Sequence, residues 1–146
     1  MKTVIYRVLI FFALTSVSCQ TKYIEVDETE IDRETLELAR NLSNKILTEQ
    51  RNGGFYSLNE KEATTQMING LSESVQKESY KTIKNLFGDY EGLKFESLMV
   101  GTDEKNYMIY RFMGDFESNA AIEIRTVLDA ENKLAGFFIK PWSDKL

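Results

Sequence analysis

The chain has 146 residues, of which 42% are hydrophobic, enough for one compact domain with a real core but not for two. It carries 18 basic and 23 acidic residues, and this net charge of -5 argues against nucleic acid as a partner. The sequence contains no histidine, which excludes Ser-His-Asp and Cys-His catalysis within one chain and the usual histidine-containing zinc sites.

The first 18 residues have the order of side chains that is typical of a secretory signal peptide. Lys2 and Arg7 supply positive charge, residues 8–14 are apolar, and residues 15–18 are small or apolar. The apolar run is much shorter than the ~20 residues that span a bilayer as a helix. We therefore predict that residues 1–18 are a cleaved signal peptide and not a permanent transmembrane anchor.

Small side chains at Ser16, Val17 and Ser18 stand immediately before Cys19, the only cysteine of the chain. This segment resembles the lipobox of bacterial lipoproteins, with Ser16 where leucine is usual. The resemblance implies cleavage before Cys19, a diacylglycerol on its sulfur and further acylation of the new amino terminus. Several acyl chains give a stable anchor, whereas one chain binds a membrane only marginally. The location implied is the bacterial cell envelope, on the outer membrane or its periplasmic side.

An ordinary secreted protein, cut near Ser18 and carrying an incidental cysteine, is the alternative. A disulfide within the chain is excluded because one cysteine has no partner. Cleavage would remove Lys2 and Arg7 and no acidic residue, so 16 of the 18 basic residues would remain against 23 acidic ones, a net charge of -7. We interpret residues 19–29 as a lipidated tether and residues 30–146 as the folded domain.

Three helices are predicted at the start of this domain from the spacing of apolar residues. Residues 30–51 form an amphipathic helix whose apolar side chains lie within about 100° on a helical wheel. Gly53 and Gly54 end this helix. A short helix over 63–71 and a third one over 72–87 follow. The apolar stripe of the first helix consists of Ile31, Leu38, Ala39, Leu42 and Ile46.

The remainder of the chain alternates between apolar and polar residues, which predicts strands. Four such runs, 93–100, 107–116, 122–128 and 134–139, are joined by short polar turns. The simplest topology is an antiparallel meander with one face under the helices. The predicted fold class is therefore α+β, with a long N-terminal helix and two short helices packed on a four-stranded antiparallel meander sheet.

The order of a helix, an aromatic connector, short helices and four strands, closed by the segment DAENKLAGFFIKP at 129–141, resembles the cystatin-like α+β superfamily. Within it, the chain is similar to the nuclear-transport-factor type of cone-shaped domain and to small secreted domains of unknown function. In that superfamily a long helix and a curved sheet enclose a pocket. Members include isomerases, cyclases, ligand carriers and dimerisation modules, so the resemblance implies a fold and not one activity.

One face of the second and third predicted strands mixes aromatic, aliphatic and arginine side chains, as the centres of interfaces do. We predict that it is an interface for self-association or for an envelope protein partner, or that it lines a pocket. The alternative is a solvent-facing sheet with cross-strand pairs of glutamate and arginine. The predicted site consists of Tyr107, Ile109, Arg111, Glu123, Arg125 and Val127.

These patterns favour a membrane-anchored lipoprotein with a non-catalytic binding domain that faces the periplasm or the cell surface. A carrier of a small apolar ligand is one alternative, and it needs an unfilled cavity between helix and sheet. A cyclase- or isomerase-like enzyme is another, and it needs a buried carboxylate such as Glu123 or Asp115 with a raised pKa. We identify no catalytic residue and expect no cofactor. We also expect no metal site, because the acidic clusters lack the alternating acids and glycine of a calcium loop.

Overall fold

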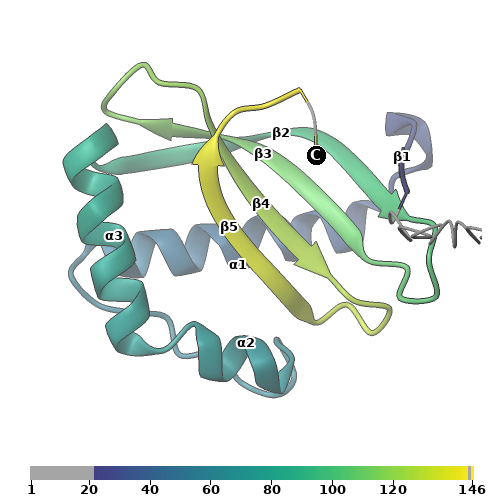
Figure 1. Ribbon diagram of the computed structural model, residues 1–146, viewed down its shortest axis with the longest axis horizontal. Helices are drawn as coiled ribbons and strands as arrows, with labels where there is room; N and C mark the ends of the chain where they lie inside the picture. The colour runs from purple at the N-terminus through teal and green to yellow at the C-terminus, as the bar shows by residue number, and fades with distance from the viewer. Residues whose placement is uncertain (1–21, 145) are drawn as a thin grey trace, which may run out of the picture.

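In the computed structural model, which describes residues 22–144 and 146, three helices lie against one antiparallel sheet (Figure 1). The strands follow one another in the sheet in the order β1-β2-β3-β4-β5, and each pairs antiparallel with the next. The elements are β1 (Tyr23–Glu25), the 3-10 helix η1 (Glu28–Glu30), α1 (Arg33–Arg51), α2 (Thr65–Gly70), α3 (Glu73–Phe87), β2 (Tyr90–Gly101), β3 (Met108–Phe116), β4 (Ile122–Leu128) and β5 (Leu134–Pro141). The predicted α+β class is confirmed.

Within the described residues the sheet has five strands, and the prediction of four was wrong in this detail. The additional strand, β1, comes from the segment 19–29 that we interpreted as a tether, and it pairs with residues 99–101 of β2. The N–H of Val26 extends this contact by donating to the carbonyl of Leu98 at 2.9 Å. A run of three residues is too short to show a strand period, and its partner lies far away in the sequence, so the pattern could not reveal this pairing.

The ends of the two long helices follow from local chemistry. The carboxylate of Asp32 accepts a hydrogen bond from the N–H of Thr35 at 2.8 Å, which caps the start of α1. Gly53 has a φ of +82° directly after α1, and Gly88 has a φ of +81° at the end of α3. Glycine adopts this left-handed region without steric cost, so both helices stop where the sequence predicted.

Side chains fill the space between α1 and the sheet. Tyr110 and Phe112 of β3 and Ile124 of β4 are completely buried on the helix side of the sheet. Beneath α1, the hydroxyl oxygens of Ser43 and Thr126 lie 2.6 Å apart in a buried hydrogen bond that joins this helix to β4. The other members of this core from α1 and the sheet are Ala39, Leu42, Ile46, Leu47, Tyr90, Leu98, Phe116, Ile122, Leu128 and Leu134.

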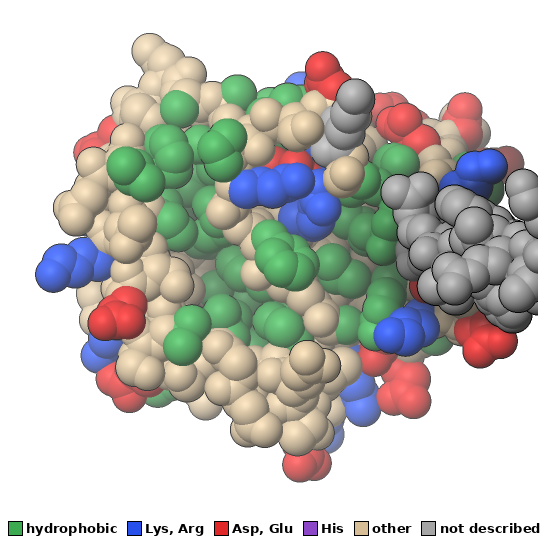
Figure 2. Space-filling model, viewed as in Figure 1, with side chains coloured by type: hydrophobic (Ala, Val, Ile, Leu, Met, Phe, Trp, Pro, Cys, Tyr) green, Lys and Arg blue, Asp and Glu red, His purple; other side chains and the backbone are tan. Residues whose placement is uncertain are grey.

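The opposite side of the sheet, which we call the outer face, carries no helix from residues 22–144 (Figure 1). In the view of Figure 1, α1 passes behind the sheet and α3 stands beside β5, so the outer face is turned towards the viewer. Figure 2 shows apolar side chains over much of this face, with a group of blue Lys and Arg side chains near its centre. Within the described part of the chain, the helices are too short or too polar to cross a membrane.

Candidate functional site

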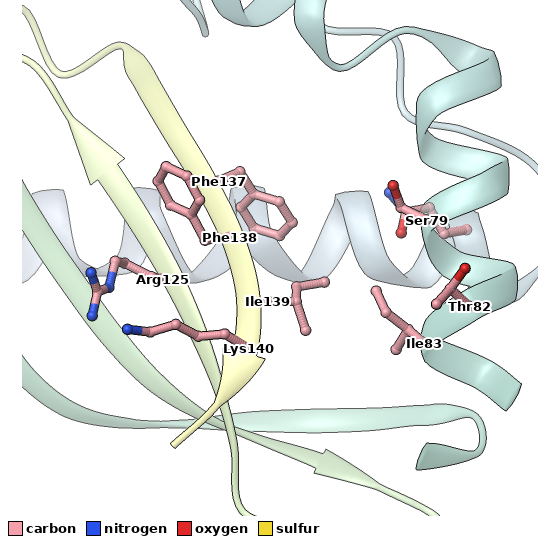
Figure 3. Close-up of a pocket in the computed structure, with 9 residues that line it drawn as sticks. Ser79, Thr82, Ile83, Arg125, Phe137, Phe138, Ile139 and Lys140 are labelled. Carbon is pink, nitrogen blue, oxygen red and sulfur yellow. The ribbon is translucent and has the colours of Figure 1, made fainter. Parts of the chain in front are cut away.

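A groove of about 580 Å³ runs between α3 and the free edge of β5. Figure 3 shows Ile139 of β5 opposite Ile83 of α3, whereas Arg125 and Lys140 lie on the other side of β5. Its volume is within the range of ~300–1,000 Å³ that is usual for ligand sites. The residues that line the groove are Gln50, Ser79, Thr82, Ile83, Arg125, Phe137, Phe138, Ile139 and Lys140.

A buried carboxylate with three cationic partners lies next to this groove on the outer face. Glu123 is fully buried, and its Oε1 is 2.7 Å from Nε of Arg111 and 3.0 Å from Nε of Arg125. Its Oε2 is 3.5 Å from Nζ of Lys140. Of the residues that line the groove, the charged ones are Arg125 and Lys140, and both are cationic. Acidic side chains, Glu25 and Asp144, line the neighbouring hollow on the outer face, together with Arg111 and Arg125.

The C-terminal segment covers part of this cluster. The ring of Trp142 lies 4.4 Å from the guanidinium carbon of Arg111, a cation–π contact. Arg111 also donates a hydrogen bond to the carbonyl of Ser143. Arg111 is therefore held within the fold. Both arginines line a second hollow of about 440 Å³ on the outer face, but Arg125 also lines the groove. Of the two arginines, Arg125 is the one that a ligand in the groove can reach.

The electrostatics of Glu123 are those of a fixed counter-charge. Burial favours a raised pKa, but the hydrogen bonds from Arg111 and Arg125 outweigh it and hold the pKa of Glu123 below its ordinary value. The carboxyl is therefore ionised at neutral pH and does not supply the proton that an acid catalyst gives. Asp115, the other acid considered for catalysis, is exposed to solvent.

The register of β3 and β4 brings most of the predicted site together. Ile109 lies opposite Val127, and Arg111 lies opposite Arg125, all on the outer face. Tyr107 precedes β3, and its ring is 5.9 Å from Nζ of Lys105. The predicted residues that lie within β3 and β4 thus share a face. Ile109, Arg111, Glu123 and Val127 are buried there, so little of this face is open to a partner.

The remainder of the groove was not included in the predicted site. Phe138 and Lys140 fall in register with Arg125 and Glu123, so the alternation along β5 carried a signal that places them on the outer face. No pattern in the sequence indicated that residues of α3 line the groove, because the position of a helix beside a sheet edge depends on packing. The residues missed are Gln50, Ser79, Thr82, Ile83, Phe137, Phe138, Ile139 and Lys140.

Two further predictions concern metal and lipid. The described residues contain no group of three His, Cys, Asp or Glu side chains that could hold a metal ion. Cys19, the predicted site of lipid attachment, lies outside the described residues.

Comparison of the chain with protein-family models, with curated proteins and with solved structures gives no match.

Proposed function

We propose that this chain is a lipoprotein of the bacterial cell envelope, anchored at Cys19, whose folded domain binds a partner protein in the groove between α3 and β5 without catalysing a reaction. The observation that carries the proposal is the pairing of an exposed aromatic side chain with two cationic side chains in the lining of the groove. Phe138 is 54% exposed, and it stands on β5 beside Lys140 and next to Arg125. Aromatic and arginine side chains are the residues that most often dominate binding energy at protein interfaces.

The two alternative functions receive less support from the geometry. A carrier needs an unfilled cavity between helix and sheet, and side chains such as Tyr110 and Phe112 fill that space below α1. An enzyme of the cyclase or isomerase kind needs a carboxylate with a raised pKa, whereas the pKa of Glu123 is lowered and Asp115 is exposed. A binding domain requires neither feature.

We also propose that the domain has the cystatin-like fold, of the nuclear-transport-factor type. The passage of α1 across one face of an antiparallel meander supports it. The lipobox-like residues before Cys19 support the envelope location and the anchor. The partner is either another envelope protein or a second copy of this chain.

The test is purification of the tagged, lipidated protein from its own membranes, followed by quantitative mass spectrometry. We expect a specific partner to be recovered with the wild type and to fall at least tenfold with Phe138→Ser. The matched control is Leu86→Ser, because Leu86 on α3 is 65% exposed but does not line the groove. Equal recovery of the same proteins with both variants would remove the groove from the proposal.

A further inference from the structure

We infer that the groove takes an extended peptide segment of its partner, which adds to β5 as a sixth strand and places an acidic side chain beside Lys140 and Arg125. This inference rests on the proposed function and names the mode of binding. Strand addition draws affinity from main-chain hydrogen bonds and specificity from pockets for alternate side chains.

The main-chain geometry of β5 supplies the free donors and acceptors. In an antiparallel pair, residues that bond the neighbouring strand alternate with residues whose N–H and C=O groups point away from it. The N–H of Trp142 donates to the carbonyl of Ala121 at 2.9 Å, and these two residues continue the register of β4 and β5. By alternation, the main-chain groups of Phe137 and Ile139 point away from β4 towards the groove. Among the described residues, no main-chain group from outside the sheet bonds to them.

One end of this edge already accepts an extended segment of the chain itself. Ala63 forms a parallel bridge with Leu134. The N–H of Leu134 donates to the carbonyl of Glu62 at 2.8 Å, and the N–H of Thr64 donates to the carbonyl of Leu134 at 3.0 Å. At the other end Pro141, which has no N–H, falls on an outward-pointing position. The open stretch therefore lies between these two ends and presents the groups of Phe137 and Ile139.

The walls of the groove define the chemistry of the peptide. Side chains alternate between the two faces of a strand, so every second residue of an added strand would meet the apolar side chains of Ile83, Phe137 and Ile139. The intervening residues would lie on the outer face beside Phe138 and Lys140. The charged residues of the groove lining, Arg125 and Lys140, are both cationic and favour an acidic residue at that place. The expected segment is thus apolar on alternate positions and carries an acid on the other set.

The position of α3 decides between an extended segment and a second copy of the sheet. In Figure 1, α3 stands alongside β5, on the side where a sixth strand would be added. A second folded sheet that approached this edge would meet α3 first, whereas a single extended chain fits between helix and strand. Gln50 also lines the groove, and its buried Oε1 has no hydrogen-bond partner within the described residues.

The test begins with a displayed library of random 12-residue peptides, selected on the detergent-solubilised, lipidated protein. We expect enrichment of peptides with alternating apolar residues and an acidic residue. The binding of one enriched peptide is then measured by calorimetry with each of its amides N-methylated in turn. Methylation of either of two amides, at positions i and i+2 of the peptide, should weaken binding at least tenfold, because these N–H groups would bond β5. Methylation of the amide at i+1, which would point away from β5, should change binding less than twofold. No enrichment, or loss of binding without this spacing of two, would overturn the inference.

A variant of the protein tests the same bonds from the other side. Ile139→Pro removes an N–H that points into the groove and leaves the bonds to β4 in place, whereas Ile139→Ala shortens the side chain but keeps that N–H. The peptide should bind at least tenfold more weakly to the proline variant than to the alanine variant, with similar thermal midpoints for both. Equal binding would overturn strand addition. If recovery of the native partner still fell with Phe138→Ser, the proposal that the partner binds in the groove would remain, and the mode of binding alone would be wrong.

Discussion

Arg111 and Arg125 lie directly opposite each other on β3 and β4, and both donate to the carboxylate of Glu123. Like charges in direct cross-strand register destabilise a sheet. Here the carboxylate between them supplies the counter-charge, and Arg111 reaches both of its oxygens, at 2.7 Å and 3.3 Å. The buried acid of this domain is therefore a structural part of its sheet.

Replacement of this acid should be among the most damaging single changes. Glu123→Gln would leave two arginines and Lys140 around a neutral amide, and a broken buried ion pair costs about 3–5 kcal/mol. Urea unfolding at pH 7 measures this loss in the free energy of unfolding. Glu131→Gln is the control, because Glu131 is exposed and pairs with Lys133 in the hairpin turn, and it should unfold like the wild type. Similar unfolding of both variants would mean that the cluster adds no stability.

The same carboxyl should make stability depend on pH in the acid range. The pKa of Glu123 is lower in the folded state than its ordinary value of 4.5, so its contribution is complete above that value. The contribution is lost as the pH falls through the folded pKa. Asp27, Asp32 and Asp89 also have lowered pKa values, so the wild type loses stability from several groups. Between pH 6 and pH 3 the free energy of unfolding should therefore fall less for Glu123→Gln than for the wild type. An equal fall in the two proteins would contradict this assignment.

The buried pair of hydroxyls that joins α1 to β4 allows a double-mutant cycle. Ser43 donates to the carbonyl of Ala39 at 2.7 Å and shares a hydrogen bond of 2.6 Å with Thr126. Ser43→Ala leaves the buried hydroxyl of Thr126 without this partner, which costs about 1–3 kcal/mol. Thr126→Val should cost less, because the hydroxyl of Ser43 keeps its bond to Ala39. The double variant should lose less than the sum of the two single losses. Urea unfolding of the four proteins gives the coupling, and strict additivity would show that the hydroxyls act independently.

The first strand should be required for full stability. A chain that starts at Asp27 lacks β1, the hydrogen bond from Val26 to Leu98, and the carbonyl of Lys22 that accepts from Thr102 at 2.9 Å. Several main-chain bonds at about 0.5–1.5 kcal/mol each predict a loss of ~2 kcal/mol or more relative to a chain that starts at Lys22. Thermal or urea unfolding of the two chains measures it. Identical midpoints would restore the interpretation of this segment as a tether.

Lipid attachment at Cys19 has a direct chemical test. A thioether-linked diacylglycerol needs the sulfur of Cys19, so a fatty-acid analogue fed to cells should label the wild type and not Cys19→Ser. The variant should also leave the membrane fraction. Membrane retention of an unlabelled variant, or equal labelling of both proteins, would remove this part of the proposal.

The sequence predicted those parts of the fold that depend on neighbours along the chain. The alternation along β3 and β4 predicted that Arg111, Glu123 and Arg125 share one face, and in the structure both arginines contact Glu123 on the outer face. Asn132 has a φ of +60° in the turn before β5, as expected for asparagine in a hairpin turn. By contrast, β1 and the groove depend on contacts between distant segments. Neither the pairing of Tyr23 with Gly101 nor the position of Ile83 near Ile139 leaves a period in the sequence.

The order of the strands also determines how the domain would carry a mechanical load. β1, which follows the proposed anchor, and β5, which borders the groove, are the two opposite edges of the sheet. Tension between the membrane and a partner held at β5 would therefore pass through all the strands in series, across their hydrogen bonds. The join between β1 and β2 involves only three residue pairs, fewer than any other in the sheet. Under force the pairing of β1 with β2 should break first. The link to the membrane would then lengthen, while the groove and its bound partner stayed in place.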